Sequence, residues 1–238
     1  MISFFKKLLR PKQVFLYNHL GLGDHIILNA LIRELVSAKS DVIFTLFVKS
    51  RNYESVKFMF SDLKNFTFCV VSSDDEVLCI LNSVSNSNII KIGFNDVTND
   101  FDKFFYKQFN LPFSKRFNKD ILNRDFISED TLFKQLNLEG KEYIFVHDDI
   151  TRDLIIDDKS ISNKDMQIIR PHITNTIFDW CKVLENAVEI HCMCSSFKAL
   201  VDSMQLTSPK LFYHHSLSNL NGPRNETFTS SNLKWTII

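Results

Sequence analysis

The sequence has no net charge, because 28 lysine and arginine residues balance 28 aspartate and glutamate residues over 238 positions. No global basic field therefore favours nucleic acid as a partner, and any anionic ligand has to be met by local groups. The sequence also has no uninterrupted apolar run of about 18 residues, the length that a helix needs to cross a bilayer. Because the start of the chain lacks the apolar core and cleavage site of a secretory leader, we expect a cytoplasmic protein.

Several catalytic signatures are missing as well. Gly21 and Gly23 are not followed by the third glycine of a dinucleotide fingerprint, and no Gly-Lys-Ser/Thr ending makes the segment a P-loop. No Gly-x-Ser-x-Gly elbow and no Ser-His-Asp order is recognisable. The usual nicotinamide and ATP sites and hydrolase chemistry therefore do not fit, and we expect no cofactor.

The five cysteines are an odd number and mostly lie within apolar runs, which favours reduced thiols in the core. Cys192 and Cys194, beside His191, lack the spacing of a zinc knuckle, and alternation along a strand sends neighbouring side chains to opposite faces. We therefore expect no metal site.

Residues 1–10 combine apolar side chains with two lysines and an arginine. This combination is typical of a weak peripheral contact with a membrane surface, and it is also typical of an ordinary lead-in to the first strand. Both interpretations stay open.

With 45% hydrophobic and 13% aromatic residues the chain has ample material for a buried core. Apolar runs alternate with helical patterns, and continuous runs such as 42–48 are typical of parallel strands covered on both faces. The sequence predicts an α/β fold of two Rossmann-like lobes with parallel sheets facing a cleft, over residues 1–140, including a helical connector, and 141–238. Strands are expected at 14–18, 42–49, 66–71, 89–94, 143–147, 166–169, 188–193, 211–214 and 234–238, with helices at 176–184 and 196–204 among those between them.

The segment 14–27 has the pattern of an apolar strand that breaks into a glycine turn and opens directly into a helix. Gly21 and Gly23 allow the backbone to approach a ligand above the strand end, where the first N–H groups of the helix carry partial positive charge. Asp24 adds a carboxylate at the same place. Alternatively, the glycines only make a tight turn and Asp24 only caps a helix over 26–36.

Ligands of open α/β sheets bind beyond the carboxyl ends of the strands, so the residues that follow each predicted strand are candidates for a site. Arg152 offers a bidentate donor for phosphate, while Ser195 and Ser196 offer hydroxyls and backbone N–H groups at a helix start. A diphosphate fits between these groups. The other strand-end candidates are His147, Asp149, His191 and Phe197.

Each of these residues also has a purely structural interpretation. Ser195 is a natural helix N-cap, and Arg152 is suited to a surface ion pair with Asp148 or Asp149. His147 and His191 end apolar strands, where a neutral histidine satisfied by the backbone is common. Their occurrence at successive strand ends favours a ligand site.

The segments His19 to Ile26, His147 to Arg152 and Glu189 to Phe197 together resemble GT-B glycosyltransferases, in particular the heptosyltransferase-like and fucosyltransferase-like groups. In heptosyltransferases a Gly-Asp pair at the first strand-to-helix turn carries the aspartate regarded as the catalytic base, so the resemblance gives this role to Asp24. It also implies an acceptor in the N-terminal lobe and a nucleotide-sugar in the C-terminal lobe, usually without a bound metal.

We therefore expect an inverting, metal-independent glycosyltransferase that moves a hexosyl or heptosyl group from a nucleotide-diphosphate-sugar to the hydroxyl of a glycan or other acceptor. Such a reaction needs a base for the hydroxyl, here Asp24, and positive groups at the leaving phosphate. Two alternatives stay open: a catalytically silent nucleotide-sugar-binding module, and an epimerase in which Asp24, His191 and His214 serve as acid and base. The expected donor-binding residues are Gly21, Gly23, His147, Asp149, Arg152, His191, Ser195, Ser196 and Phe197.

Overall fold

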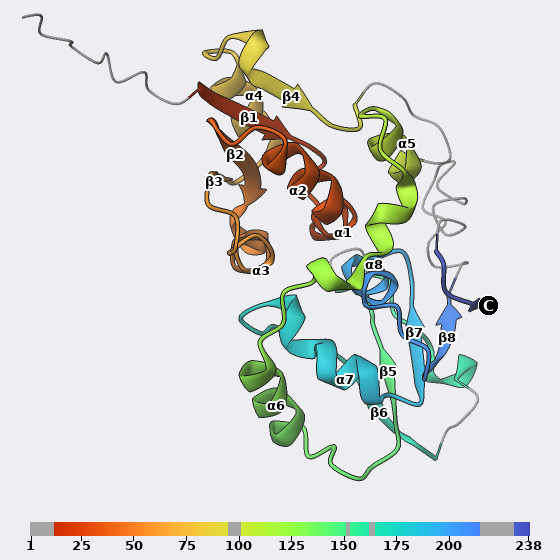
Figure 1. The fold of residues 1–238 in the computed structure, drawn as a ribbon. Helices are drawn as coiled ribbons and strands as arrows, with labels where there is room; N and C mark the ends of the chain where they lie inside the picture. The colour runs from red at the N-terminus through yellow and green to blue at the C-terminus, as the bar shows by residue number, and fades with distance from the viewer. Residues whose placement is uncertain (1–11, 95–100, 151–152, 162–164, 215–230) are drawn as a thin grey trace, which may run out of the picture.

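Two parallel sheets follow one another along the chain. The computed structural model describes residues 12–94, 101–150, 153–161, 165–214 and 231–238. The first sheet has four strands in the order β3-β2-β1-β4, all parallel to their neighbours (Figure 1). Its strands are β1 (Lys12–Tyr17), β2 (Val42–Lys49), β3 (Phe66–Val71) and β4 (Ile89–Lys91).

The second sheet has five strands in the order β6-β5-β7-β8-β9, again all parallel. Every residue of β5 and of β7 is buried, as expected for central strands with both faces covered. The predicted fold class is confirmed, because each all-parallel sheet with its flanking helices makes one Rossmann-like lobe. The strands are β5 (Tyr143–Val146), β6 (Gln167–Ile169), β7 (Glu189–Cys192), β8 (Lys210–Tyr213) and β9 (Trp235–Ile237).

The helices are short. No helix among the described residues is long and apolar enough to cross a membrane, and residues 1–10 lie outside the described part of the chain. The α-helices are α1 (Leu22–Ile27), α2 (Asn29–Ser37), α3 (Tyr53–Met59), α4 (Asp74–Leu81), α5 (Phe101–Lys107), α6 (Phe126–Gln135), α7 (Cys181–Asn186) and α8 (Ser196–Met204). The 3-10 helices are η1 (Ser50–Asn52), η2 (Asn86–Asn88), η3 (Phe113–Phe117), η4 (Lys119–Ile121), η6 (Asp158–Ser160) and η7 (Ile177–Trp180).

The first helical segment differs from the prediction of one helix over 26–36. The helix begins at Leu22, because Gly21 is its N-cap, and a single residue, Leu28, separates α1 from α2. Helical hydrogen bonding continues through this residue, since the Leu28 N–H donates to the Asp24 carbonyl at 2.9 Å. Asp24 is therefore the third residue of α1 rather than a residue preceding the helix.

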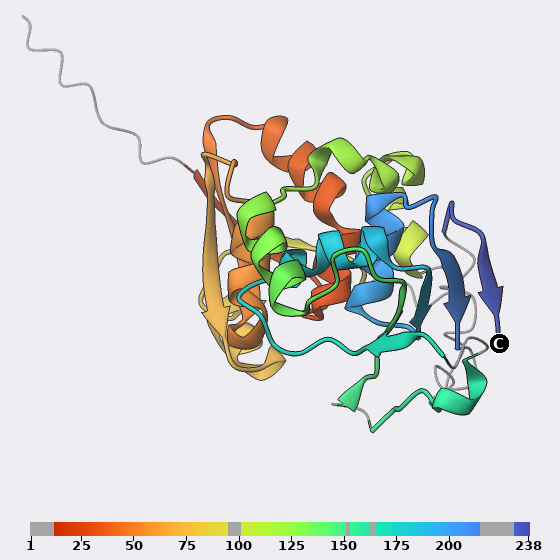
Figure 2. The same ribbon diagram turned by 90° about the horizontal axis from the view of Figure 1, so that it is seen from below.

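The two lobes share one hydrophobic core. A single cluster of buried side chains includes Leu16 and Ile26 from the first lobe together with Phe145 and Leu200 from the second. Figure 2 shows the two sets of strands at opposite sides of the molecule, with helices between them. The first sheet lies wholly before residue 92 and the second wholly after residue 142, whereas the domain boundary after residue 140 stays a prediction.

Candidate functional site

Gly21 permits a close approach of the Asp24 carboxylate. Gly21 has an extended backbone conformation (φ −71°, ψ 143°) that ends the loop after β1. A Cβ on Gly21 would lie only 2.5 Å from Oδ2 of Asp24, closer than a real side chain tolerates. The half-buried carboxylate is therefore folded back over the turn, where the positive end of the helix favours negative charge.

Gly23 brings this turn into contact with the other lobe. A Cβ on Gly23 would lie 3.5 Å from Cα of Ser196, 3.6 Å from its nitrogen and 3.7 Å from the carbonyl carbon of Ser195. The start of α1 therefore packs against the start of α8. The structure thus brings together Gly21, Gly23 and Asp24 from one sequence motif with Ser195 and Ser196 from another.

The start of α8 is a candidate anion site. Ser195 is its N-cap, and Oγ of Ser195 accepts a hydrogen bond from the Lys198 N–H at 3.4 Å, so the structural interpretation of Ser195 is correct. The N–H groups of the first turn have no partner within the helix, and their partial positive charge attracts phosphate. A cap and a phosphate site are compatible, because one serine oxygen serves only one of these N–H groups.

His147 and Phe197 pack on each other. Their ring centroids are 4.7 Å apart, and Phe197 also contacts Phe145 at 5.1 Å. The His147 N–H donates to the His191 carbonyl at 2.9 Å, which continues the pairing of β5 with β7. His147, directly after β5, therefore packs against the first turn of α8 through Phe197.

The acidic residues after β5 are held by specific partners. Oδ2 of Asp148 accepts from Nε of Arg170 at 2.6 Å, and Oδ1 accepts from the Ile156 N–H at 2.8 Å. Asp149 pairs through its backbone with Leu154. Asp148 is thus paired with an arginine other than the one the sequence suggested, and that arginine, Arg152, lies outside the described residues.

His191 lies on the sheet face opposite α8. It is in register with Val146 and Phe212, and it stacks on the Phe212 ring at a centroid distance of 4.6 Å. Its Nδ1 lies 3.0 Å from Nε2 of His214, and its Nε2 lies 3.5 Å from Oε2 of Glu189. The structure therefore groups His191 with His214 rather than with Ser195.

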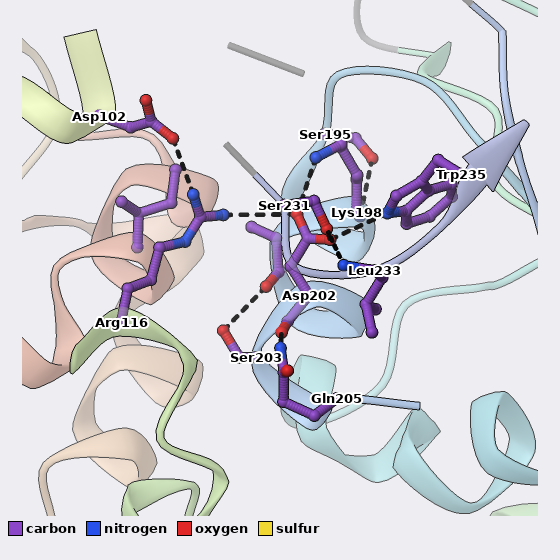
Figure 3. A network of polar contacts seen from close by, with 12 residues as sticks. Asp102, Arg116, Ser195, Lys198, Asp202, Ser203, Gln205, Ser231, Leu233 and Trp235 are labelled. Carbon is purple, nitrogen blue, oxygen red and sulfur yellow. Dashed lines mark hydrogen bonds and ion pairs between the residues drawn. The ribbon is translucent and has the colours of Figure 1, made fainter. Parts of the chain in front are cut away.

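A buried ion network, which sequence reasoning missed, holds α8 against the N-terminal half of the chain (Figure 3). Nη1 of Arg116, on η3, donates to Oδ2 of Asp102, on α5, at 2.7 Å. Nη2 of Arg116 lies 3.5 Å from Oδ2 of Asp202, on α8, which also accepts from Nζ of Lys198 at 2.7 Å. The four side chains are each at least nine-tenths buried, and their two positive and two negative charges balance.

Asp202 is the centre of this network. Its other oxygen, Oδ1, accepts from the hydroxyl of Ser231 at 2.6 Å and from the indole N–H of Trp235 at 3.0 Å. Burial by itself would raise the pKa of Asp202, but Lys198 and Arg116 hold it below its usual range. The four-residue spacing of Lys198 and Asp202 is visible in the sequence as a helical pair, whereas nothing in the sequence relates Arg116 to a residue 86 positions away.

A shallow polar hollow lies beside α6 and the loop after β6. It has a volume of about 340 Å³. His172, at its rim, packs edge-on against Trp180 at 5.2 Å, and Trp180 contacts Phe197 at 6.3 Å, so aromatic rings connect the hollow with the start of α8. The lining residues are Ser128, Thr131, Leu132, Gln135, His172, Ile173, Thr174, Asn175 and Asp179.

The cysteines are all free, and the prediction of core thiols holds for Cys181 and Cys192, which are buried, but not for Cys79, which is exposed. Within the described part of the chain, no three His, Cys, Asp or Glu side chains are grouped to hold a metal ion. Comparison of the chain with family models, curated proteins and solved structures found no match.

Proposed function

We propose that this protein transfers a sugar from a nucleotide-diphosphate-sugar to an acceptor hydroxyl, with Asp24 as general base and the start of α8 as phosphate site. The observation that carries the proposal is the contact of Gly23 with Ser196. Gly23 precedes Asp24 and Ser196 begins α8, so the contact supports a site in which a carboxylate and a helix start suited to an anion come from different lobes. Sugar transfer needs these two chemistries at one place.

The reaction follows from these groups. The acceptor hydroxyl gives its proton to the Asp24 carboxylate while its oxygen forms a bond to the anomeric carbon of the donor. The bond from that carbon to the phosphate oxygen breaks, and its electron pair stays on the diphosphate. The N–H groups at the start of α8 and the Ser195 and Ser196 hydroxyls stabilise this charge. A single displacement of this kind inverts the anomeric configuration.

In this proposal the donor binds to the second lobe and the acceptor to the first. The nucleotide-diphosphate end of the donor occupies the carboxyl ends of β5, β7 and β8, where ligands of parallel sheets bind, and its uncharged part extends toward the polar hollow beside α6. The acceptor approaches from the first lobe, on the side of Asp24. General-base catalysis of this type contributes about 100- to 10,000-fold to the rate.

A catalytically silent nucleotide-sugar-binding module is the second candidate. It is favoured by the position of the Asp24 carboxylate over Gly21, which is also the position of an acid that only stabilises the start of α1. Both candidates bind the donor, and only the transferase consumes it.

The test combines binding and turnover on the full chain. Thermal unfolding is measured with UDP, GDP, ADP, CDP and dTDP, because a ligand at 100 times its Kd adds about 2.7 kcal/mol of apparent stability. Radiolabelled sugar esters of the nucleotide that binds are then incubated with glycan acceptors and with none. Transfer or slow donor hydrolysis supports the transferase, binding without turnover supports the silent module, and an isomerised sugar nucleotide would identify an epimerase.

A further inference from the structure

Glu189, His191 and His214 lie on one face of the second sheet, away from α8. Glu189 and His191 are two residues apart on β7, and side chains two apart on a strand share a face. Register pairs Glu189 with Lys210 and His191 with Phe212, so His214, two residues beyond Phe212, lies on the same face. Its backbone N–H donates to the Cys192 carbonyl at 2.9 Å, which anchors it at the carboxyl end of β8.

The three side chains form a continuous buried chain of polar atoms. Glu189 and His191 are each 1% exposed and His214 is 4% exposed. Oε2 of Glu189 lies 3.5 Å from Nε2 of His191, and Nδ1 of His191 lies 3.0 Å from Nε2 of His214. Stacking on Phe212, with ring planes 14° apart, fixes the orientation of the His191 ring. The two nitrogens of His191 therefore face Glu189 on one side and His214 on the other.

The hydrogen bonds along this row of three side chains can point in either of two directions. A bond between two imidazoles needs an N–H on one ring and a lone pair on the other, and a carboxylate only accepts. With two N–H groups, both neutral rings can donate toward Glu189 or both can donate away from it. One additional proton fills every position, so that His191 donates at both nitrogens and His214 carries the remaining N–H at the strand end.

Charged groups face the chain at both ends. Nζ of Lys210, on β8, lies 3.7 Å from Oε1 of Glu189. The Asp148 carboxylate, which follows β5 and is paired with Arg170, favours the charged form of His214 and so raises its pKa. This row of side chains thus runs from Lys210, exposed at the amino end of β8, to the carboxyl edge of the sheet, where α8 follows β7.

The isolated protein keeps both rings neutral near pH 7. Burial lowers the pKa of His191. Burial and the neighbouring His191 lower the pKa of His214 to about 4, although the Asp148 carboxylate acts in the opposite direction. An anion bound at the same sheet edge favours the form of the His191–His214 pair that carries the additional proton.

We propose that Glu189, His191 and His214 form a proton relay that takes up one proton when a diphosphate binds at the carboxyl ends of β7 and β8. The inference rests on the proposed function for the place of the diphosphate. In the transfer step His214 gives its N–H proton to the phosphate oxygen that receives the electron pair of the broken bond, and the Nδ1 proton of His191 moves to Nε2 of His214. The pair ends neutral, and it takes up its next proton from the solvent when the next donor binds.

The test is calorimetric titration of the full chain with inorganic pyrophosphate, GDP and UDP near pH 6, in buffers that differ in ionisation enthalpy. The number of protons taken up by His214→Gln per bound ligand is subtracted from that of the wild type, which removes the protons that the ligand itself exchanges. We expect the wild type to take up about one more proton per bound diphosphate than His214→Gln or Glu189→Gln. Glu139→Gln, at an exposed glutamate outside the proposed site, should match the wild type.

Nitrogen-15 NMR of labelled histidines in the wild type gives a second readout, which needs no variant to fold. When diphosphate is added, one histidine should change from the neutral to the doubly protonated ring, so that both of its nitrogens take the shift of a protonated imidazole. Binding without excess uptake, or with unchanged shifts, overturns the relay and leaves the transferase proposal intact. If none of the three probes binds, the relay and the phosphate site both fail.

Discussion

A side chain on Gly23 would touch the backbone of Ser196 at 3.5 Å, so the first helix of one lobe begins directly against a helix of the other. This contact joins two sequence motifs, each of which is weak evidence for a ligand site when taken alone. A carboxylate at the start of a helix is often only a helix cap, and a serine at a helix start is often only an N-cap. Their convergence is what supports a site, and the following predictions test it.

Asp24→Asn should lower the turnover of sugar transfer about 100- to 10,000-fold, because an amide cannot take the acceptor proton. The Kd for the nucleoside diphosphate should change little. Asp75→Asn is the matched control, since Asp75 is also an acidic residue in the first turn of a helix, α4, in the same lobe. Steady-state kinetics and calorimetry measure both. Transfer at the wild-type rate by Asp24→Asn would remove Asp24 from the role of base.

Ser195→Ala should weaken diphosphate binding, whereas Ser73→Ala should not. Both serines are N-caps whose Oγ accepts from the N–H three residues later, at 3.4 Å for Ser195 and 3.3 Å for Ser73. Each substitution therefore costs a similar free energy of unfolding, about 1 kcal/mol. Only Ser195→Ala removes a phosphate contact, and we expect the Kd of this variant for the nucleoside diphosphate to rise about 10-fold. Equal Kd values in the two variants would contradict a phosphate site at α8.

Gly21→Ala and Gly23→Ala should differ although they lie two residues apart. A Cβ at Gly21 collides with the Asp24 carboxylate, whereas a Cβ at Gly23 makes ordinary contact with Ser196. Misplacement of a catalytic group by about 1 Å can cost about 100-fold. We expect Gly21→Ala to lower kcat by about 10-fold or more without unfolding the protein, and Gly23→Ala to retain most activity. Indistinguishable kcat values would show that the carboxylate position is unimportant.

Arg116→Met should strongly lower the free energy of unfolding, because it leaves the buried Asp102 carboxylate without its cation. Breaking a buried ion pair costs about 3–5 kcal/mol. The double variant Arg116→Met with Asp102→Asn should recover part of this loss. Lys57→Met is the control: its partner Glu54 is 3.9 Å away and both side chains are about half exposed, so the expected cost is about 0.5 kcal/mol or less. Urea titrations give all four values.

His25 should make the protein sensitive to mild acid. Burial lowers the pKa of His25 to about 3 from its ordinary 6.5, and its Nε2 has no hydrogen-bond partner among the described residues. Below pH 6.5 the His25 side chain therefore binds a proton in the unfolded chain but not in the folded protein. Stability is fully present above that pH and falls as pH drops toward 3, by about 1.4 kcal/mol per unit at most.

Urea unfolding at several pH values checks this effect. His25→Gln should show a shallower loss of stability between pH 6.5 and 4 than the wild type, since the substituted side chain does not titrate. His172→Gln, at an exposed histidine, should retain the wild-type slope. Parallel slopes for all three proteins would mean that His25 is protonated in the folded state.

Much of the fold could be predicted because its elements carry strong local patterns. The strands 42–49 and 66–71 and the helix 196–204 match the prediction at both ends, since continuous apolar runs and a serine cap mark them clearly. The start of the first helix was missed by four residues, because Gly21 caps it without a side chain. Caps of this kind leave little trace in a sequence.

Side-chain periodicity and local turn chemistry encode the alternation of strands and helices, the parallel sheets and the residues available at the strand ends, so these features could be predicted. Which strand-end residues meet depends instead on how the two lobes pack. The fold brought Gly23, the neighbour of Asp24, against Ser196, separated His191 from Ser195 by placing them on different sides of a sheet, and joined Arg116 to Asp202. Such contacts arise from the packing of distant elements, and no local pattern encodes a distance between two lobes.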